Sequence, residues 1–553
     1  MNNLINQIRN IHYLEANSII KHISGIVNYF SSEDEKTEFI SIYDDGQHIA
    51  CEDRASYGDW QTPTSLSDKV CERHISRFGN PNIVIEPTCG LGAFVFSALK
   101  KFPDLSEIHA LEINHQYAFE LKLKLLSDAL NAPSQTRPDI YIYNADFFGF
   151  DFSSIISKVN KHNWNLAIIG NPPWVTNSRQ GKYNSHNVPS KRNSYGLKGI
   201  DAITGKSNFD ISEYITLHLL NLSQTSKGGI SFLLKNSVIR NILVKQMTER
   251  IHIGHIEQSM IDASSEFNVS VDASCFSAQF DCTPSLICRI KDFYTDSYIR
   301  RYGWNNDSFV ADIELYNGFA KYDNHSNYIW RSGIKHDCAS VLELTLTDGV
   351  YTNGFGETVQ IEDDLIYPLL KSSHINSYQT NKFRKFLIVP QRRVGDDTST
   401  LKDTHPLAYS YLTQYETAFS NRKSSIYKGR DRFSIFGVGD YSFKPYKIVV
   451  SSLYKTLNFI LVSQFEGKPI MVDDTCYQLD FDNTEEAQCI FKALHSNEIQ
   501  SLLKSLIFMD AKRVITKNLL MRLDISLLCK EKGMNLNNQS SNNGVCCQLS
   551  LFD

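Results

Sequence analysis

Four consecutive residues, Asn171, Pro172, Pro173 and Trp174, follow the apolar run 166–170 and could handle a planar amine. Two successive prolines fix the backbone and donate no N–H, so the Asn171 amide oxygen and the Pro172 carbonyl oxygen can both accept hydrogen bonds from a ligand. An amine that donates to both oxygens is drawn from its conjugated, planar state towards a tetrahedral one, which frees its lone pair. The Trp174 ring could stack on a base, a contact worth about 1–3 kcal/mol. By themselves, the four residues equally fit an ordinary strand-to-loop turn with a buried tryptophan.

Three further expected strands end in residues that suit a nucleotide-like ligand. The run 83–86 ends in Glu86 and leads into a turn with Gly90 and Gly92, followed by an apolar helical pattern at 93–99. Glycines let a backbone approach a ligand closely, although a Gly-x-Gly pair alone is a weak signal. The run 108–112 ends in Glu112, at about the twenty-residue distance expected of a carboxylate that binds ribose hydroxyls.

The remaining expected strand, 140–143, is followed by Asp146 and Phe147. The carboxylate could accept a hydrogen bond from an adenine amine, and the ring could stack on the base. Strands that alternate with helical patterns predict an α/β protein with a mostly parallel sheet and helices on both faces. Such sheets bind ligands at the carboxyl ends of their strands, so all four strand ends should meet in one site.

With Gln61, Thr62 and Pro63 upstream, these motifs resemble the gamma-class, Taq-type S-adenosylmethionine-dependent N6-adenine DNA methyltransferases over about residues 55–285. The resemblance implies a Rossmann-like methyltransferase sheet followed by a C-terminal α+β target-recognition domain. It also implies that S-adenosylmethionine contacts the strand ends and the segment upstream of them. The residues implied in cofactor binding are Thr62, Glu86, Thr88, Cys89, Gly90, Gly92, Glu112, Asp146 and Phe147.

By the same resemblance, the catalytic residues that hold the target base are Asn171, Pro172, Pro173 and Trp174, where Tyr or Phe is commoner than Trp. The implied reaction is direct methyl transfer without a covalent enzyme intermediate, a metal ion or a catalytic His or Cys. An adenine within a duplex cannot reach such a pocket, so it must be flipped out at a cost of a few kcal/mol. Phe267 is a candidate second aromatic for the flipped base, or else a core residue at the start of a strand.

Length and composition suggest several domains in a globular, cytoplasmic protein. At 553 residues the chain exceeds one typical domain, and it has no apolar run near the roughly 20 residues of a membrane helix. Its twelve cysteines form no Cys-x-x-Cys pair, which favours reduced thiols. We expect a helical extension at 1–50, a catalytic domain at 51–290, a target-recognition domain at 291–530 and a disordered tail at 531–553.

Two basic stretches are candidates for contact with DNA despite the net charge of −5. The loop 175–208 contains Lys191 and Arg192, and it could close over the target base or simply be solvated. The stretch 382–447 interleaves basic and aromatic residues, a pattern typical of phosphate and base contacts but also of a solvated basic surface. Its candidate DNA-binding residues are Arg392, Arg393, Arg430 and Arg432.

Three functions remain open from the sequence. The first is methylation of N6 of adenine in double-stranded DNA; by resemblance alone, it would belong to a restriction-modification or similar defence system with a possible cognate endonuclease. The second keeps the cofactor but acts on RNA adenine or a protein glutamine amide, because the motif 171–174 also suits an amide. The third is a non-catalytic module that binds the cofactor or DNA.

Overall fold

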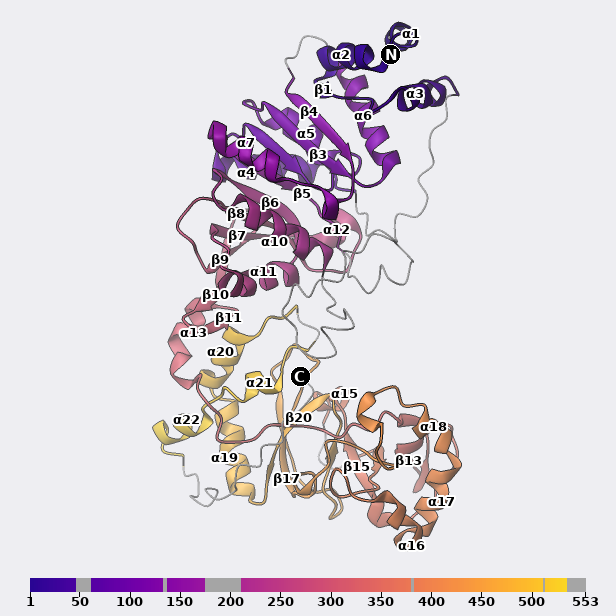
Figure 1. The fold of residues 1–553 in the computed structure, drawn as a ribbon. Helices are drawn as coiled ribbons and strands as arrows, with labels where there is room; N and C mark the ends of the chain where they lie inside the picture. Colours follow the sequence, from indigo (N-terminus) through magenta and orange to yellow (C-terminus); the bar gives the residue numbers. More distant parts are fainter. Residues whose placement is uncertain (46–60, 133–136, 175–209, 379–381, 511–512, 535–553) are drawn as a thin grey trace. The chain divides into compact units, whose positions relative to one another are not determined.

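The computed structural model describes residues 1–45, 61–132, 137–174, 210–378, 382–510 and 513–534 (Figure 1). The chain forms two compact units, Met1–Val310 and Ala311–Asp553. The division falls after Val310, later in the chain than the boundary at residue 290 expected from the sequence, because strands between 287 and 310 extend the first unit's sheet. Lys191, Arg192 and most of the expected tail lie outside the described residues.

An 11-stranded sheet forms the centre of the first unit, in the order β1-β4-β3-β2-β5-β6-β8-β7-β9-β10-β11. The first six strands in this order are parallel, and β8 runs antiparallel to both of its neighbours. The strands are β1 (Ile26–Val27), β2 (Ile83–Glu86), β3 (Glu107–Glu112), β4 (Asp139–Asn144), β5 (Leu166–Gly170), β6 (Gly228–Lys235), β7 (Gly254–Ile261), β8 (Ala273–Gln279), β9 (Ile287–Asp292), β10 (Tyr298–Asn305) and β11 (Ser308–Val310).

Helices cover both faces of this sheet, since every residue of the central strands β2, β3 and β5 is buried. In one group of helices α4 packs on α5, and in another α10 packs on both α7 and α11. The helices of the first unit are α1 (Asn2–Ile8), α2 (Tyr13–Ser24), α3 (Glu33–Asp45), α4 (Thr64–Phe78), α5 (Ala93–Lys101), α6 (His115–Asn131), α7 (Ser153–His162), α10 (Ile211–Ser223), α11 (Asn236–Glu249) and α12 (Ala263–Phe267). The expected α/β sheet, with parallel central strands and helices on both faces, is thereby confirmed.

The N-terminal segment is part of the first unit. β1 pairs in parallel with β4, and α2 packs on α6. Leu4, Ile5 and Ile8 of α1 belong to the same buried core as Leu121 and Leu125 of α6. The apolar periodicity at the start of the chain therefore reflects helices that bury one face against the rest of the first unit.

The second unit is an α+β structure with two sheets, ordered β12-β20-β17-β18 and β14-β13-β16-β15-β19. Its strands are β12 (Arg331–Ser332), β13 (Glu343–Thr347), β14 (Val350–Thr352), β15 (Ile366–Leu370), β16 (Lys385–Ile388), β17 (Tyr446–Ser451), β18 (Phe459–Val462), β19 (Met471–Val472) and β20 (Cys476–Phe481). Its helices are α13 (Ile313–Phe319), α14 (Ala339–Leu342), α15 (Ser372–Ile375), α16 (Leu401–Thr404), α17 (Pro406–Gln414), α18 (Glu416–Ser420), α19 (Thr484–Leu494), α20 (Asn497–Leu506), α21 (Lys517–Leu520) and α22 (Ile525–Glu531).

Within the described ranges, none of the helices in either unit combines the length and the apolar character needed to cross a bilayer.

Candidate active site

The predicted site residues of the first unit come together at one edge of its sheet. Glu86 ends β2, Glu112 ends β3, Asp146 follows β4 and Asn171 follows β5. These four strands are adjacent and parallel in the order β4-β3-β2-β5, so their carboxyl ends lie side by side. One edge of the sheet therefore carries the glycine turn, three carboxylates and the Asn-Pro-Pro-Trp turn.

The glycine turn after β2 is held by the neighbouring strand β3. The Cys89 N–H donates to the Leu111 carbonyl oxygen at 2.8 Å, and the Gly90 N–H donates to Glu112 Oε2 at 2.8 Å. Gly92 has a φ of +87°, and a Cβ there would lie 2.2 Å from Leu121 Cδ1, so a larger residue would displace the Leu121 side chain. Both the left-handed backbone and the close contact explain why this position is glycine.

Glu112 is occupied on both oxygens by the protein itself. Besides Gly90, the Asn114 N–H donates to Glu112 Oε1 at 2.8 Å. Glu112 therefore fixes the glycine turn and the start of the segment that follows β3.

Glu86 and Thr88 each present a buried polar atom without a hydrogen-bond partner among the described residues, namely Glu86 Oε2 and Thr88 Oγ1. Burial, together with the nearby charge of Glu112, raises the pKa of the Glu86 carboxyl group well above its usual range. Buried polar atoms normally find partners, and an orphaned pair at a strand end indicates that a polar ligand supplies them. An ammonium group or a hydroxyl would fit, and S-adenosylmethionine carries both.

The segments after β3 and β4 form a second part of the edge. Asp146 accepts a hydrogen bond from the Phe148 N–H at 3.1 Å and begins the short 3-10 turn Phe147–Gly149. The Phe147 ring is buried and packs against Phe152, with a centroid distance of 5.3 Å. By contrast Ile113, directly after Glu112, is 44% exposed.

Ile113 is a candidate contact for a ligand that the sequence pattern did not reveal. Its only signal in the sequence is an apolar residue immediately after Glu112. Asn144 Nδ2 donates to the carbonyl oxygens of Glu112 and Ile113, at 2.9 and 3.1 Å, and so fixes the backbone at this position. An exposed apolar side chain on a fixed backbone is suited to packing against a base.

In the Asn-Pro-Pro-Trp turn, Asn171 Nδ2 donates to Thr62 Oγ1 at 3.3 Å. Among the described residues, no backbone N–H donates to the Pro172 carbonyl oxygen. Trp174 is buried, and its Nε1 donates to the Leu233 carbonyl oxygen at 3.1 Å. The turn is therefore fixed at both ends and keeps a carbonyl acceptor between them.

Phe267 lies next to Trp174, at the end of the short helix α12 and not at the start of a strand. The two rings meet edge to face, with a centroid distance of 5.3 Å and an interplanar angle of 72°. A base sandwiched between two rings needs about 7 Å between their centroids, because each stacked pair is separated by roughly 3.5 Å. In this arrangement Phe267 supports the Trp174 ring and leaves no room for a base between them.

The sequence has a curated relative that matches almost from end to end. No protein-family model matches the chain. The type II methyltransferase M.NspV of Nostoc sp. (strain ATCC 29411 / PCC 7524) is 40% identical over 479 residues, which are 86% of this chain and 98% of that protein. This chain belongs to the type II methyltransferases.

A solved structure shares the fold of this methyltransferase. The type IIL restriction-modification enzyme MmeI, solved in complex with DNA, matches with a TM-score of 0.51 and 11% identity, covering 83% of this chain and 64% of MmeI. The chain therefore corresponds to just under two thirds of MmeI, and this likeness concerns the fold alone. A DrdV–DNA complex matches at a TM-score of 0.45 and 11% identity over 88% of this chain and 58% of DrdV.

S-adenosylmethionine is the cofactor of this methyltransferase, and the residues at the sheet edge fit it. Glu86 and Thr88 offer the orphaned polar atoms, and Gly90 and Gly92 let the backbone come close. The predicted cofactor is confirmed.

The predicted DNA-binding arginines belong to the second unit of the methyltransferase, and all four are exposed. The Arg392 guanidinium lies 4.2 Å from the centre of the Phe443 ring, and Arg393 pairs with Asp440 at 2.6 Å. Arg432 pairs with Glu416 at 3.0 Å. Exposed ion pairs contribute little to stability, so these side chains can exchange their partners for phosphate groups at low cost.

Other basic residues of the stretch 382–447 are structural. Arg422 donates to the carbonyl oxygens of Phe419, His336, Ser434 and Arg432. Lys447 is buried, and its ammonium donates to the Lys444 carbonyl oxygen at 3.0 Å. Local charge in the sequence therefore overstates the basic surface of the second unit.

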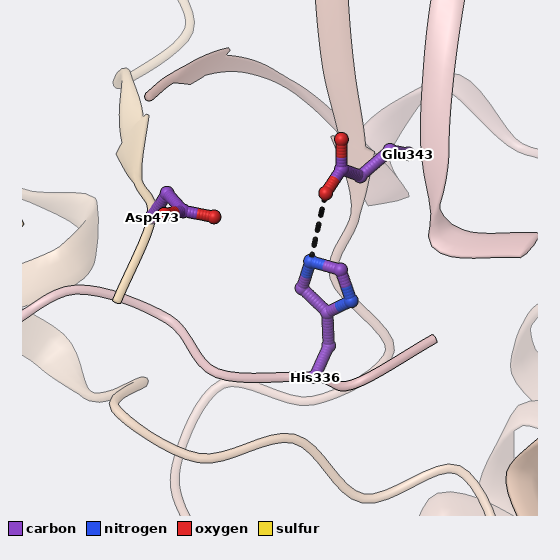
Figure 2. A group of neighbouring side chains, drawn as sticks. All are labelled: His336, Glu343 and Asp473. Carbon is purple, nitrogen blue, oxygen red and sulfur yellow. Dashed lines mark ion pairs between the residues drawn. The ribbon is translucent and has the colours of Figure 1, made fainter. Parts of the chain in front are cut away.

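A cluster of potential metal ligands in the second unit consists of His336, Glu343 and Asp473, whose ligand atoms lie within 4.8 Å of one another (Figure 2). Lys371 Nζ lies 2.6 Å from Glu343 Oε1 and 3.7 Å from Asp473 Oδ2. His336 Nδ1 accepts from the Cys338 N–H at 3.2 Å, which leaves Nε2 to donate towards Glu343 at 3.4 Å. We interpret the cluster as an ion-pair network in which the Lys371 ammonium supplies the positive charge that a metal ion would otherwise supply.

We expect Glu343→Gln to lower the free energy of unfolding by about 2 kcal/mol at neutral pH, because it removes the closer of the two carboxylates that pair with the Lys371 ammonium and leaves only Asp473. His336 and Lys371 hold the pKa of Glu343 at about 2 in spite of its burial. The folded-state pKa is depressed, so the stabilisation is present above the unfolded-state pKa of about 4.3 and is lost as the pH falls towards 2. Urea unfolding of wild type and variant from pH 7 to pH 2.5 measures the difference between their free energies of unfolding, which should shrink as the pH falls.

The matched control for Glu343 is Asp364→Asn, since Asp364 pairs with His405 in the same unit but its side chain is 71% exposed. We expect a change of less than about 1 kcal/mol for this exposed pair. A rise in wild-type stability on adding Zn²⁺, abolished by Glu343→Gln, would instead show that the cluster binds a metal ion.

Proposed function

We propose that this methyltransferase is a gamma-class enzyme that methylates N6 of a flipped-out adenine in double-stranded DNA. The observation that carries the proposal is the Asn171-Pro172 turn at the sheet edge that also bears Glu86 and Glu112. Hydrogen-bond acceptors for an amine thus share one edge with the residues that fit the methyl donor. Adenine N6 is an exocyclic amine that such acceptors recognise.

Asn171 Oδ1 and the Pro172 carbonyl oxygen would accept the two N–H groups of the target amine. The Pro172 carbonyl belongs to a backbone that successive prolines make rigid, and the Asn171 side chain is held by its hydrogen bond to Thr62, so both acceptors are aligned before the base enters. Acceptors fixed in this way stabilise the positive charge that grows on N6 during transfer. Trp174, together with Pro173, would form the wall against which the base stacks, and Phe267 would hold the Trp174 ring in place.

The cofactor would be held by the strand-end residues, with S-adenosylmethionine supplying an electrophilic methyl group. Glu86 and Thr88 would bind the amino-acid portion, close to Thr62 and the turn of Cys89, Gly90 and Gly92. Glu112 would accept from the ribose hydroxyls. Asp146 and Phe147 would bind the adenine, a role to which the exposed Ile113 adds an apolar surface.

Affinity for DNA and the choice of sequence would come largely from the second unit as a target-recognition domain. Arg392, Arg393, Arg430 and Arg432 would contact phosphates or guanine edges, and Lys191 and Arg192, which lie outside the described residues, would add further phosphate contacts. Membership of the type II methyltransferases, and the likeness in fold to the restriction-modification enzyme MmeI, support a role as the modification enzyme of a restriction-modification system. A cognate restriction endonuclease would be its biological partner.

The decisive experiment supplies the purified protein with S-adenosylmethionine labelled in its methyl group and with three substrates in parallel. These are duplex DNA, RNA of the same sequence and a glutamine-containing peptide library. We expect labelled N6-methyladenine, identified by mass spectrometry of digested nucleosides, only from the DNA. Label in RNA or peptide alone would contradict the DNA assignment, and no transfer by a folded, cofactor-binding protein would favour a non-catalytic module.

The same proposal can be checked in cells by sequencing genomic DNA with and without the gene. A sequence-specific set of N6-methyladenines should appear only when the protein is expressed.

A further inference from the structure

The hydrogen bond between Asn171 and Thr62 joins two distant segments of the chain. Asn171 Nδ2 is the donor and Thr62 Oγ1 the acceptor, at 3.3 Å. Thr62 was expected only to contact the cofactor. The bond shows that it also contacts the residue proposed to bind the target amine.

The direction of this bond matters because a carboxamide has two different ends. Its oxygen is an acceptor, whereas its NH₂ group is a donor. A target amine donates both of its N–H groups, so it needs Asn171 Oδ1 and is repelled by Nδ2. With Nδ2 committed to Thr62, the amide oxygen is turned to the other side, and the productive orientation is set before the base arrives.

Thr62 can act as a fixed acceptor because the helix that follows it is anchored to several elements. Thr62 directly precedes Pro63, which restricts its backbone, and the Pro63 carbonyl oxygen accepts from the Leu66 N–H in the first turn of α4, at 3.0 Å. Ser67 Oγ of α4 lies 2.8 Å from Ser97 Oγ of α5. His74 Nδ1 lies 2.9 Å from Ser231 Oγ of β6.

At its other end, α4 is tied to β7, because both Arg73 and Arg77 pair with the buried Glu257. Gln61, which precedes Thr62 in the sequence, faces the glycine turn. Its Oε1 accepts from the Leu91 N–H at 3.5 Å, and a Cβ on Gly90 would lie 3.3 Å from its Nε2. The short segment 61–62 therefore contacts both the cofactor turn and the catalytic turn.

We infer that Thr62 is a positioning residue, whose hydroxyl orients the Asn171 carboxamide so that Oδ1 faces the target amine. This inference rests on the proposed function, and it concerns a role of Thr62 that is separate from contact with the cofactor. A residue that acts through Asn171 should influence the rate of transfer and not the affinity for the cofactor.

The test compares Thr62→Val, which keeps the shape and removes the hydroxyl, with Thr62→Ser, which keeps the hydroxyl. We expect Thr62→Val to lower kcat for DNA adenine about 10- to 100-fold, the size of effect that a misplaced reacting group produces. The dissociation constant for S-adenosylmethionine, measured by calorimetry, should change less than about threefold, and Thr62→Ser should restore kcat to within about threefold of wild type.

A double-mutant cycle with Asn171→Ala, measured by single-turnover labelling, tests whether Thr62→Val slows transfer through Asn171. We expect Thr62→Val to cause little further loss once Asn171 is gone, because residues that act as a unit are not additive. The inference is overturned if Thr62→Val has wild-type kcat, if its whole defect is weaker cofactor binding, or if the same fold loss persists beside Asn171→Ala. A wild-type protein that methylates no adenine overturns the proposed function, and this inference with it.

Discussion

Asn171→Ala should reduce the rate of methyl transfer by about 10²- to 10³-fold or more while leaving S-adenosylmethionine binding intact. The substitution removes one of the two acceptors proposed to stabilise charge on N6, and loss of a single such group typically costs about that factor in kcat. The turn itself should persist, because Pro172 and Pro173 fix its backbone and Trp174 remains tied to the Leu233 carbonyl oxygen. Single-turnover labelling of duplex DNA and calorimetric titration of the cofactor measure the two quantities separately.

Asn80→Ala is a matched control for this experiment. Asn80 is exposed and precedes β2, so it lies at the amino edge of the sheet, opposite the catalytic turn. Its loss should leave kcat within about twofold of wild type, as expected of a surface substitution away from the site. A rate for Asn171→Ala that equals that of Asn80→Ala would remove the turn from the mechanism.

Asn171→Asp separates the acceptor from the donor of the side chain. The carboxylate can still accept from the target amine, but it cannot donate to Thr62 Oγ1. We expect a rate between those of wild type and Asn171→Ala. Equality of the Asp and Ala variants would mean that orientation by Thr62 is as important as the acceptor itself.

The position of the site could be predicted from the sequence because it depends on a simple rule of topology. Glu86, Glu112, Asp146 and Asn171 each follow an apolar run of strand length, and parallel strands place such residues at one edge. The glycine turn could also be predicted, since Gly90 and Gly92 stand between an apolar run of strand length and a helical pattern. These features are local, so one-dimensional patterns contain them.

Contacts between segments far apart in the chain could not be predicted in this way. Two examples are the hydrogen bond from Asn171 to Thr62 and that from Trp174 to Leu233. Each depends on how helices and strands that are far apart in the sequence pack together. The direction of the Arg422 side chain, which points into the second unit, could not be predicted from the sequence pattern. The same holds for the extension of the first sheet up to Val310. Sequence patterns therefore identify the candidate site residues, whereas their hydrogen-bond partners follow only from the tertiary structure.

Glu86→Gln should weaken S-adenosylmethionine binding by about 10- to 100-fold at pH 7, the equivalent of one charge-assisted hydrogen bond. In the protein without cofactor, burial and the nearby Glu112 raise the pKa of the Glu86 carboxyl group well above its usual range. A cofactor ammonium beside Glu86 favours the ionised carboxylate. Binding below the raised pKa must therefore release a proton, and wild-type affinity should increase with pH by at most tenfold per pH unit.

Calorimetry from pH 5.5 to 7.5, in buffers of different ionisation enthalpy, measures both the affinity and the released proton. This range stays below the pKa near 8 of the cofactor's own amino group. Glu86→Gln should lose both the slope and the proton release, whereas Glu15→Gln, an exposed substitution in α2, should keep them. Wild-type affinity that is independent of pH would show that Glu86 does not face the ammonium.

Folding stability without the cofactor should respond to pH in the opposite direction. A carboxyl group whose pKa is raised in the folded state stabilises the protein below its unfolded-state pKa of about 4.3, and that contribution is lost as the pH rises through the folded-state pKa. Glu86→Gln removes this loss, so the variant should gain stability over wild type as the pH rises, although it binds the cofactor less well. Only a carboxylate kept for its ligand produces this combination, because a residue present for stability would weaken the fold when replaced.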